Sequence, residues 1–135
     1  MHLDFLLPKS IGNQVIQHTI YTLSYNENHE QADWVAYKLY KNSINDSVKR
    51  KDDFRIDPKV TTSSATLSDY KRSGYDRGHL CPAGDRRYSK SAHDETFLTS
   101  NISPQKHDFN SGIWNTLEQN VRYWANKYDG VYVVT

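Results

Sequence analysis

The apolar and polar positions at the start of the chain predict two paired strands. Val15–Tyr25 and Ala32–Tyr40 are rich in Tyr, Val, Ile, Trp and Thr, which are the residue types that favour strands. The polar segment Asn26–Gln31 between them is typical of a hairpin connection. We therefore expect a β-hairpin in this part of the chain.

The pattern is weaker in the middle of the chain. Residues 41–74 are rich in Ser, Asp, Lys and Thr, and we expect them to be mostly irregular, with a short strand near Phe54–Ile56. Two further short elements are expected after this region, a helical turn over Ser89–Asp94 and a strand over Thr96–Ser100.

A long helix is predicted over Asn110–Tyr128, followed by a stop at Asp129-Gly130 and a buried strand over Val131–Val134. The apolar face of this helix consists of Ile113, Trp114, Leu117, Val121 and Trp124. A buried strand at the end of an intact domain is unusual, because termini tend to lie in solvent. We expect a single domain over residues 1–135, and whether it is truncated at its C-terminus stays open.

The composition excludes several classes of protein. Aromatic residues make up 13% of the chain, including ten Tyr and three Trp, which argues against disorder. No apolar run approaches the roughly 18 residues that a membrane span needs, so we expect no membrane-spanning segment. The single cysteine excludes an internal disulfide framework and a multi-cysteine zinc finger.

Charge is unevenly distributed along the chain, although the formal net charge is only +1. Residues 48–90 hold eleven Lys and Arg against six Asp, a net charge of +5, and each flank has a net charge of −2. The middle third therefore carries a positive field that can attract an anionic substrate. An unevenly charged, solvated surface is the alternative.

Two clusters of polar residues can carry chemistry. The first, 75–85, reads Tyr-Asp-Arg-Gly-His-Leu-Cys-Pro-Ala-Gly-Asp, and the second, 100–110, reads Ser-Asn-Ile-Ser-Pro-Gln-Lys-His-Asp-Phe-Asn. A histidine with an ordinary pKa, near 6.5, can act as a general base at neutral pH, so activity is expected to rise as the pH climbs through the pKa of His79. Guanidinium groups match phosphate oxygens, and the candidates near His79 are Arg72, Arg77, Arg86 and Arg87, with Lys71 as a point charge.

The second cluster leads into the predicted helix. Asn110, in its first turn, can present a side-chain oxygen to a hard cation. Glu118, two turns later, lies about 80° round a regular helix and can reach a water on the metal or an arginine. A zinc site formed by His79, Cys81, His93 and His107 is an alternative, but its spacing matches no recognised zinc pattern.

These two clusters, in this order and spacing, resemble the sugar-nonspecific DNA/RNA endonuclease family. Its hallmark string Asp-Arg-Gly-His stands at 76–79, and its second block stands at Ser100–Glu118. The resemblance extends to Trp34–Tyr37, to residues 50–57 and to Val131–Thr135, and so covers most of the chain from about residue 20 onward.

The resemblance implies an α+β fold with an antiparallel sheet and a ββα-metal core of the His-Me finger type. In this core a strand ends at the catalytic histidine and a helix carries the metal-ligand asparagine. His79 would then be the general base, Asn110 the only direct protein ligand of Mg²⁺, and Glu118 the group that holds the ion's water. Mn²⁺ or another divalent cation is the alternative to Mg²⁺.

The same resemblance suggests which residues contact the substrate. Arg50 is the counterpart of the arginine that stabilises the phosphate, with Lys49, Lys51 and Arg55 as nearby alternatives, and Arg77 belongs to the motif. The residues expected to bind substrate or shape its site are Asp76, Arg86, Arg87, Asn101 and Gln105.

The function implied is Mg²⁺-dependent hydrolysis of DNA and RNA, which leaves 5′-phosphate and 3′-hydroxyl ends. A nucleic-acid-binding module of the same fold without turnover is the alternative. The family resemblance implies secreted, periplasmic or mitochondrial homes, and we expect secretion or the periplasm rather than the cytoplasm. The oligomeric state stays open, a homodimer included.

Overall fold

The computed structural model describes residues 7–10, 12–41 and 47–135. In chain order its elements are β1 (Gln14–Gln17), β2 (Thr22–Asn26), β3 (Gln31–Leu39), α1 (Leu67–Tyr70), β4 (Asp76–His79), η3 (Ala83–Arg86), α2 (Lys90–Glu95), η4 (Thr99–Asn101), β5 (Ile102–Gln105), α3 (His107–Phe109), η5 (Asn110–Trp114), α4 (Asn115–Lys127) and β6 (Val131–Val134). The η3 and η4 segments are 3-10 helices, and η5 is a π-helical turn.

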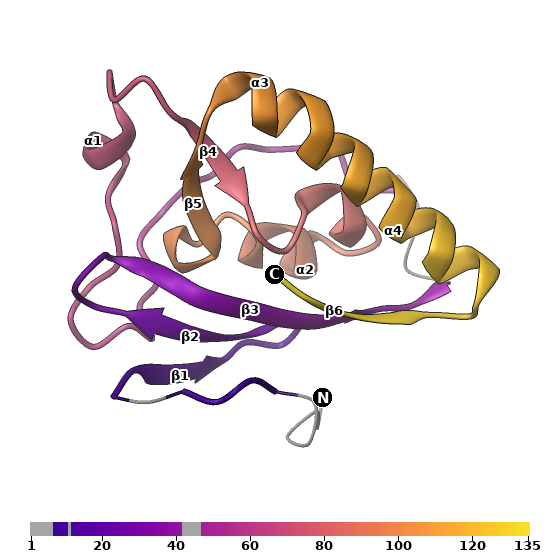
Figure 1. Cartoon of the computed structure of the whole chain (residues 1–135), viewed down its shortest axis with the longest axis horizontal. Coiled ribbons are helices and arrows are strands. Elements are labelled where there is room, and N and C mark those ends of the chain that lie inside the picture. Colours follow the sequence, from indigo (N-terminus) through magenta and orange to yellow (C-terminus); the bar gives the residue numbers. More distant parts are fainter. Residues whose placement is uncertain (1–6, 11, 42–46) are drawn as a thin grey trace.

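A four-stranded antiparallel sheet in the order β1-β2-β3-β6 forms one layer of the molecule. Figure 1 shows α2, α4 and the β4–β5 pair together on one side of this sheet. The main core lies between the two layers, where Leu23 and Val35 of the sheet belong to the same buried cluster as Ala92 of α2 and Ala125 of α4. No helix in the described ranges is long and apolar enough to cross a membrane.

The expected hairpin is confirmed, because β2 and β3 pair antiparallel across residues 27–30. The prediction of one strand over Val15–Tyr25 is wrong. The chain reverses between β1 and β2, where the amide of His18 donates a hydrogen bond to the carbonyl of Tyr21, 2.9 Å away. This turn contains neither glycine nor proline, so the sequence carries no local signal for it.

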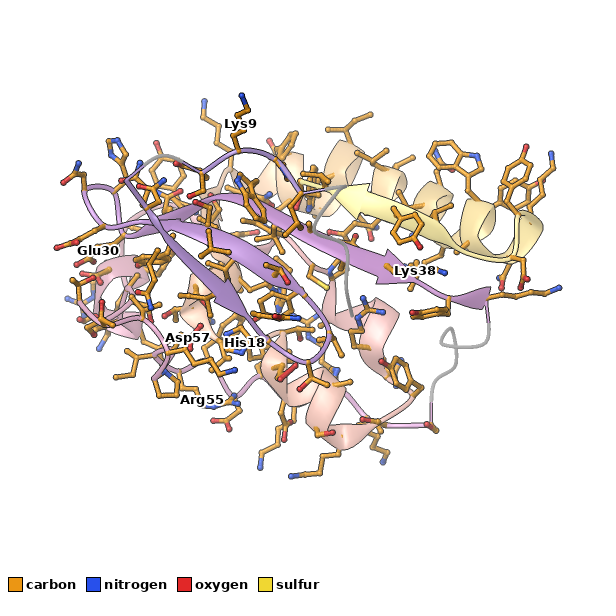
Figure 2. The ribbon with its side chains drawn as sticks, turned by 90° about the horizontal axis from the view of Figure 1, so that it is seen from below. Lys9, His18, Glu30, Lys38, Arg55 and Asp57 are labelled. Carbon is orange, nitrogen blue, oxygen red and sulfur yellow. The ribbon has the colours of Figure 1, made fainter. Side chains whose placement is uncertain are left out.

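A buried hydrogen bond between His18 and Asp57 fixes the β1–β2 turn to the segment after residue 54. His18 Nε2 lies 2.6 Å from Asp57 Oδ2, and the two labelled residues lie side by side in Figure 2. Ser100 and the Lys59 amide also donate hydrogen bonds to this carboxylate. Burial raises the pKa of Asp57, but these hydrogen bonds outweigh it and hold that pKa below its usual value.

The middle region only partly follows expectation. The described residues of 41–74 are mostly irregular, with α1 as an exception, and residues 42–46 lie outside the described part. After this region, α2 confirms the helical turn expected over Ser89–Asp94. The predictions of strands over Phe54–Ile56 and Thr96–Ser100 are wrong, because these two segments share only one isolated β-bridge, between Arg55 and Leu98. The chain turns at 96–97 and enters η4, because side-chain and turn hydrogen bonds replace a ladder there.

The long helix is present, but it does not begin as a regular helix. The π-turn η5 separates α3 from α4, and Gly112 inside it has non-helical dihedral angles. Its predicted apolar face is also only partly buried, since Ile113, Leu117 and Trp124 remain exposed at 66%, 43% and 42%. Val121 and Ala125 provide the contact with the core instead.

The strand predicted after the helix is confirmed as β6, but its expected burial is not. It pairs with β3 and lies at the edge of the sheet. Val131 and Val133 pack against the core, whereas Tyr132 and Val134 on the other face are half exposed. This alternation is typical of a strand with only one covered face.

Candidate active site

The first cluster forms β4, which pairs antiparallel with β5 from the second cluster. Asp76 lies opposite Gln105, and His79 lies opposite Ile102. Gly78 is needed between them, because a Cβ atom there would stand 2.2 Å from the side chain of Gln105. The pairing thus brings the two clusters together, and the helix that follows β5 completes a ββα arrangement.

His79 lies at the end of β4 in an aromatic pocket. Only 8% of the residue is exposed, and its ring makes an edge contact with Phe97 at 4.9 Å between centroids and a tilted contact with Phe54 at 5.7 Å. The indole of Trp114 donates a hydrogen bond to the backbone carbonyl of His79 at 3.2 Å, which fixes the strand end to the helix. The Nε2 atom of His79 is buried and has no hydrogen-bond partner within the described residues.

The environment of His79 strongly favours the neutral imidazole. Burial has the largest effect, and the charges of Arg50, His93 and Arg77 act in the same direction, so that the pKa of His79 falls to about 3 although Asp52 raises it. At neutral pH this histidine is therefore already able to accept a proton. The rise in activity expected as the pH climbs through the pKa of His79 is therefore expected well below pH 6.5.

Asn110 begins η5 and is tied to the first residue of β4. Its Nδ2 atom donates to Asp76 Oδ2 at 3.1 Å, and His107 Nδ1 lies 2.8 Å from the same oxygen. These two hydrogen bonds lower the pKa of Asp76, and the carboxylate in turn raises the pKa of His107. Because the amide nitrogen is held by Asp76, the amide oxygen is the atom that Asn110 can offer to a cation.

Two arginines flank this arrangement. The guanidinium of Arg77 lies over the Phe54 ring, with Cζ 4.2 Å from its centroid. Arg50 donates from Nε to Asp52 Oδ1 at 2.7 Å, and both side chains are more than half exposed. The segment that carries Arg50 is fixed to α2, because the backbone amide of Lys51 donates a hydrogen bond to His93 Nε2 at 3.3 Å.

The predicted catalytic residues converge on one hollow of about 260 Å³, which we call the His79 groove. The predicted residues that line it are Arg50, Arg77, His79, Asn110 and Glu118. The residues that sequence reasoning missed include Ser111, Asn115 and Arg122. The structure thus brings the candidate base, the candidate amide ligand, the carboxylate and two cationic side chains to one surface.

Of the missed residues, Arg122 could have been predicted to lie at the site from its spacing in the sequence. It follows Glu118 by four positions on α4, a spacing at which side chains meet. Its Nη2 atom lies 3.7 Å from Glu118 Oε2. Gly84 lies against the same guanidinium, because a Cβ atom there would stand 2.7 Å from Nη2.

Three residues expected to contact substrate lie away from the groove. Asn101 is fully buried, donates to the carbonyls of Cys81 and Thr96 and accepts from the Cys81 amide, so it joins segments of backbone. Arg86 is 1% exposed and donates to the carbonyl of Lys38. Arg87 donates to the carbonyl of Val48. The expectation that these three side chains reach substrate is not supported by their positions.

The two remaining expected residues lie beside the groove. Asp76 acts on Asn110 as described above, and Gln105 packs across Gly78 with its Oε1 atom buried and unpaired within the described residues. Neither side chain therefore lines the His79 groove itself.

The donor set fits a hard cation better than zinc. Within the described ranges, no group of three or more His, Cys, Asp or Glu side chains is placed to hold a metal ion, so the alternative zinc site does not assemble. An amide oxygen and a carboxylate in one groove are ligands that Mg²⁺, Mn²⁺ or Ca²⁺ accept, with water in the other positions.

Comparison with known proteins identifies relatives over nearly the whole chain. The family model for DNA/RNA non-specific endonuclease matches residues 3–135. The mitochondrial nuclease EXOG of Danio rerio is 41% identical over 133 residues, which is 97% of this chain and 38% of that protein. Human mitochondrial endonuclease G is 40% identical over 117 residues, which is 85% of this chain and 39% of that protein.

A solved structure shows the same fold. The crystal structure of the EndoG/EndoGI complex, which concerns the mechanism of EndoG inhibition, matches with a TM-score of 0.83 and 41% identity. The match covers 90% of this chain and 52% of that one. The predicted α+β fold with a ββα-metal core is thereby confirmed. The chain spans about two fifths of the length of the Danio rerio EXOG and human endonuclease G proteins that it matches.

The expected location is wrong. The sequence led us to expect a secreted or periplasmic protein, but the relatives from Danio rerio, human, mouse and Xenopus laevis are named as mitochondrial nucleases. The chemistry expected of the motif residues is the same in every compartment, so the motif carries no information about location.

Proposed function

Because the chain belongs to the DNA/RNA non-specific endonuclease family, we propose that it hydrolyses phosphodiester bonds in both DNA and RNA. The observation that carries this proposal is the convergence of His79, Asn110 and Glu118 on one groove together with Arg50 and Arg77. The names of its relatives support a mitochondrial location.

His79 is the proposed general base. A phosphodiester is cleaved when an activated water attacks phosphorus in line with the leaving oxygen. The imidazole is neutral at physiological pH and lines the groove, so it can take the proton of that water as the new bond forms. Cleavage on the 3′-oxygen side leaves 5′-phosphate and 3′-hydroxyl ends.

Arg50 and Arg77 are proposed to bind the phosphate. Their guanidinium groups line the groove on the side of His79, where each can donate paired hydrogen bonds to phosphate oxygens. The stacking of Arg77 on Phe54 restricts its motion and holds its charge at the rim. Because phosphate contacts carry no base information, little sequence preference is expected.

Asn110 is the proposed protein ligand of a divalent cation, and Mg²⁺ is the ion we propose. When bound, Mg²⁺ acts as a Lewis acid that stabilises negative charge on the phosphate. Asp76 holds the Asn110 amide so that its oxygen is free for the ion. Glu118 supplies a carboxylate in the same groove, which can accept hydrogen bonds from the ion's waters.

The test is cleavage of plasmid DNA and bulk RNA with Mg²⁺, with EDTA, and by the His79→Ala variant. Removal of a general base should lower the rate by about 10²-fold or more, and EDTA should abolish cleavage. His29→Ala is the matched control, because His29 is exposed in the β2–β3 turn and should leave the rate unchanged.

Two outcomes would contradict the proposal. Near-wild-type cleavage by a folded His79→Ala variant would exclude this histidine as the base. Salt-sensitive binding of nucleic acid without cleavage by the folded wild-type chain would favour the binding module, since such affinity comes from phosphate contacts.

A further inference from the structure

A second cleft of about 580 Å³ opens beside the His79 groove, and we call it the Tyr75 cleft. The two hollows share Arg50, Arg77 and Asn110 along their common border. The far wall of the Tyr75 cleft comes from α1 and the turn before β4, including Leu67 and Tyr75. A strand of nucleic acid held at the groove would therefore continue into this cleft.

Tyr75 lines the far wall of the cleft with an aromatic side chain that is partly open to solvent. Its side chain directly precedes the motif strand and is 48% exposed. The turn that carries it is well defined, because the Tyr75 amide donates to Ser73 Oγ at 3.1 Å and the Ser73 amide donates to the Tyr70 carbonyl at 3.1 Å. Gly74 between them has a φ of +83°, a conformation that glycine adopts without strain.

Tyr70 has a different role from Tyr75. Its hydroxyl donates to the Ile102 carbonyl, and its ring packs against the buried cluster of Phe54 and Phe97. Tyr70 thus belongs to the wall of the cleft, whereas Tyr75 offers ring surface to a ligand.

The charges in the cleft suit an anion. Both acids are occupied, since Asp52 accepts from Arg50 and Asp76 accepts from Asn110. No ion pair involves Lys71 among the residues that the structure describes. Its ammonium is therefore available to a phosphate next to the one held in the groove.

We propose that the Tyr75 cleft binds an unpaired nucleotide next to the scissile phosphate, with its base stacked on Tyr75 and its phosphate near Lys71. The inference rests on the proposed nuclease function and adds to it the class of substrate. A base within a duplex is already stacked and paired, so it must leave the helix to reach this ring. Every base has a π-face, so the site favours single-stranded DNA and RNA without favouring a sequence.

Binding tests this proposal without turnover, in the His79→Ala background. The probes are fluorescent oligo(dT), oligo(U) and a covalently closed DNA duplex. Tyr75→Ala should weaken binding of both single strands about tenfold and change duplex binding by less than about twofold. Tyr75→Phe keeps the ring and should bind like the parent, and Tyr123→Ala removes an exposed tyrosine of α4 as the matched control.

A second variant keeps the test decisive if Tyr75→Ala does not fold. Tyr75→Leu keeps apolar volume without a π-face and should lose the same single-strand preference. Unchanged binding of both single strands by the folded variants would overturn the proposal. Equal losses for single strands and duplex would overturn it too, since they would indicate a general contact with the backbone.

Cleavage separates this inference from the nuclease function itself. With His79 restored, Tyr75→Ala should lower the ratio of single-strand to duplex cleavage about tenfold, in line with the binding loss. Its rate on an abasic single strand, which has the phosphodiester backbone but no base to stack, should stay unchanged. Absence of all cleavage by the wild-type chain would contradict the nuclease function, whereas an unchanged ratio would contradict only the role of Tyr75.

Discussion

Four consecutive residues of β4 have four different tasks at the candidate site. Asp76 anchors the amide of Asn110, and Arg77 holds a positive charge at the border of two hollows. Gly78 leaves room for a neighbouring side chain, and His79 is kept neutral by burial. Each task requires a specific residue type, so a substitution at each position should change a different measurable quantity.

Loss of the Asp76 carboxylate should weaken cation binding. Asp76→Ala removes the group that orients Asn110, and the loss of such a supporting hydrogen bond costs metal affinity about 10- to 100-fold. The Mg²⁺ concentration that gives half-maximal cleavage should rise accordingly, with a smaller change in the rate at saturating Mg²⁺. Asp108→Ala, at an exposed residue next to His107, is the control, and an equal response of both variants would contradict the role of Asp76.

At the scale of elements, the π-turn η5 decides how the helix meets the strands. In a regular helix from Asn110, the side chain of Glu118 would lie about 80° round the helix axis from that of Asn110. The wider π-turn over Asn110–Trp114 changes this angle between the two side chains. The same turn carries Trp114, whose ring stacks on Phe109 and whose indole donates to the end of β4. π-turns are frequent at functional sites, and here the turn joins Asn110, the proposed metal ligand, to the strand that ends at His79, the proposed base.

Trp114→Phe should measure the strength of this connection. The variant keeps an aromatic ring but removes the hydrogen bond to the His79 carbonyl, so the free energy of unfolding should fall by about 1 kcal/mol. Urea denaturation gives this value. Trp124→Phe, at an exposed position of α4, should change it by less than about 0.5 kcal/mol, and equal effects at the two positions would argue against the connection.

For the whole molecule, two buried ionisable sites make stability depend on pH. His79 stays neutral in the folded chain down to a pKa of about 3, whereas in the unfolded chain it gains a proton near pH 6.5. Asp57 stays ionised in the folded chain below its usual pKa because of its contact with His18. In both cases the unfolded chain binds more protons as the pH falls, so acid destabilises the fold.

The free energy of unfolding should therefore decrease between pH 6.5 and pH 3, with a further loss near and below pH 4 as Asp57 is protonated. Thermal unfolding at pH 7 and pH 5 isolates the contribution of His79. The melting temperature of the wild type should fall between these two values, and that of His79→Ala should fall less. An identical shift in both proteins would show that His79 is not kept neutral by the fold.

Local patterns in the sequence were sufficient for the elements that depend on neighbouring residues. The β2–β3 hairpin, α2 and most of α4 follow from residue types and periodicity within about 20 positions. The two polar clusters also indicated that His79, Asn110 and Glu118 belong to one site, because their spacing matches a recognised pattern.

Contacts between distant segments decided the rest. The reversal at His18 depends on Asp57, which lies 39 residues later, and the burial of Arg86 depends on a carbonyl of β3, 48 residues earlier. In the sequence Arg86 is one more arginine beside the motif, but in the fold it is inside the molecule. Tyr75 shows the converse: the sequence places it directly before the motif, but only the turn before β4 places it at a cleft.

The sequence by itself therefore determined which chemical groups this protein has and roughly which elements carry them, because these follow from the order of residues along the chain. Only the tertiary structure decided which of those groups face a common groove, because a side chain is exposed or buried according to segments that are remote in sequence.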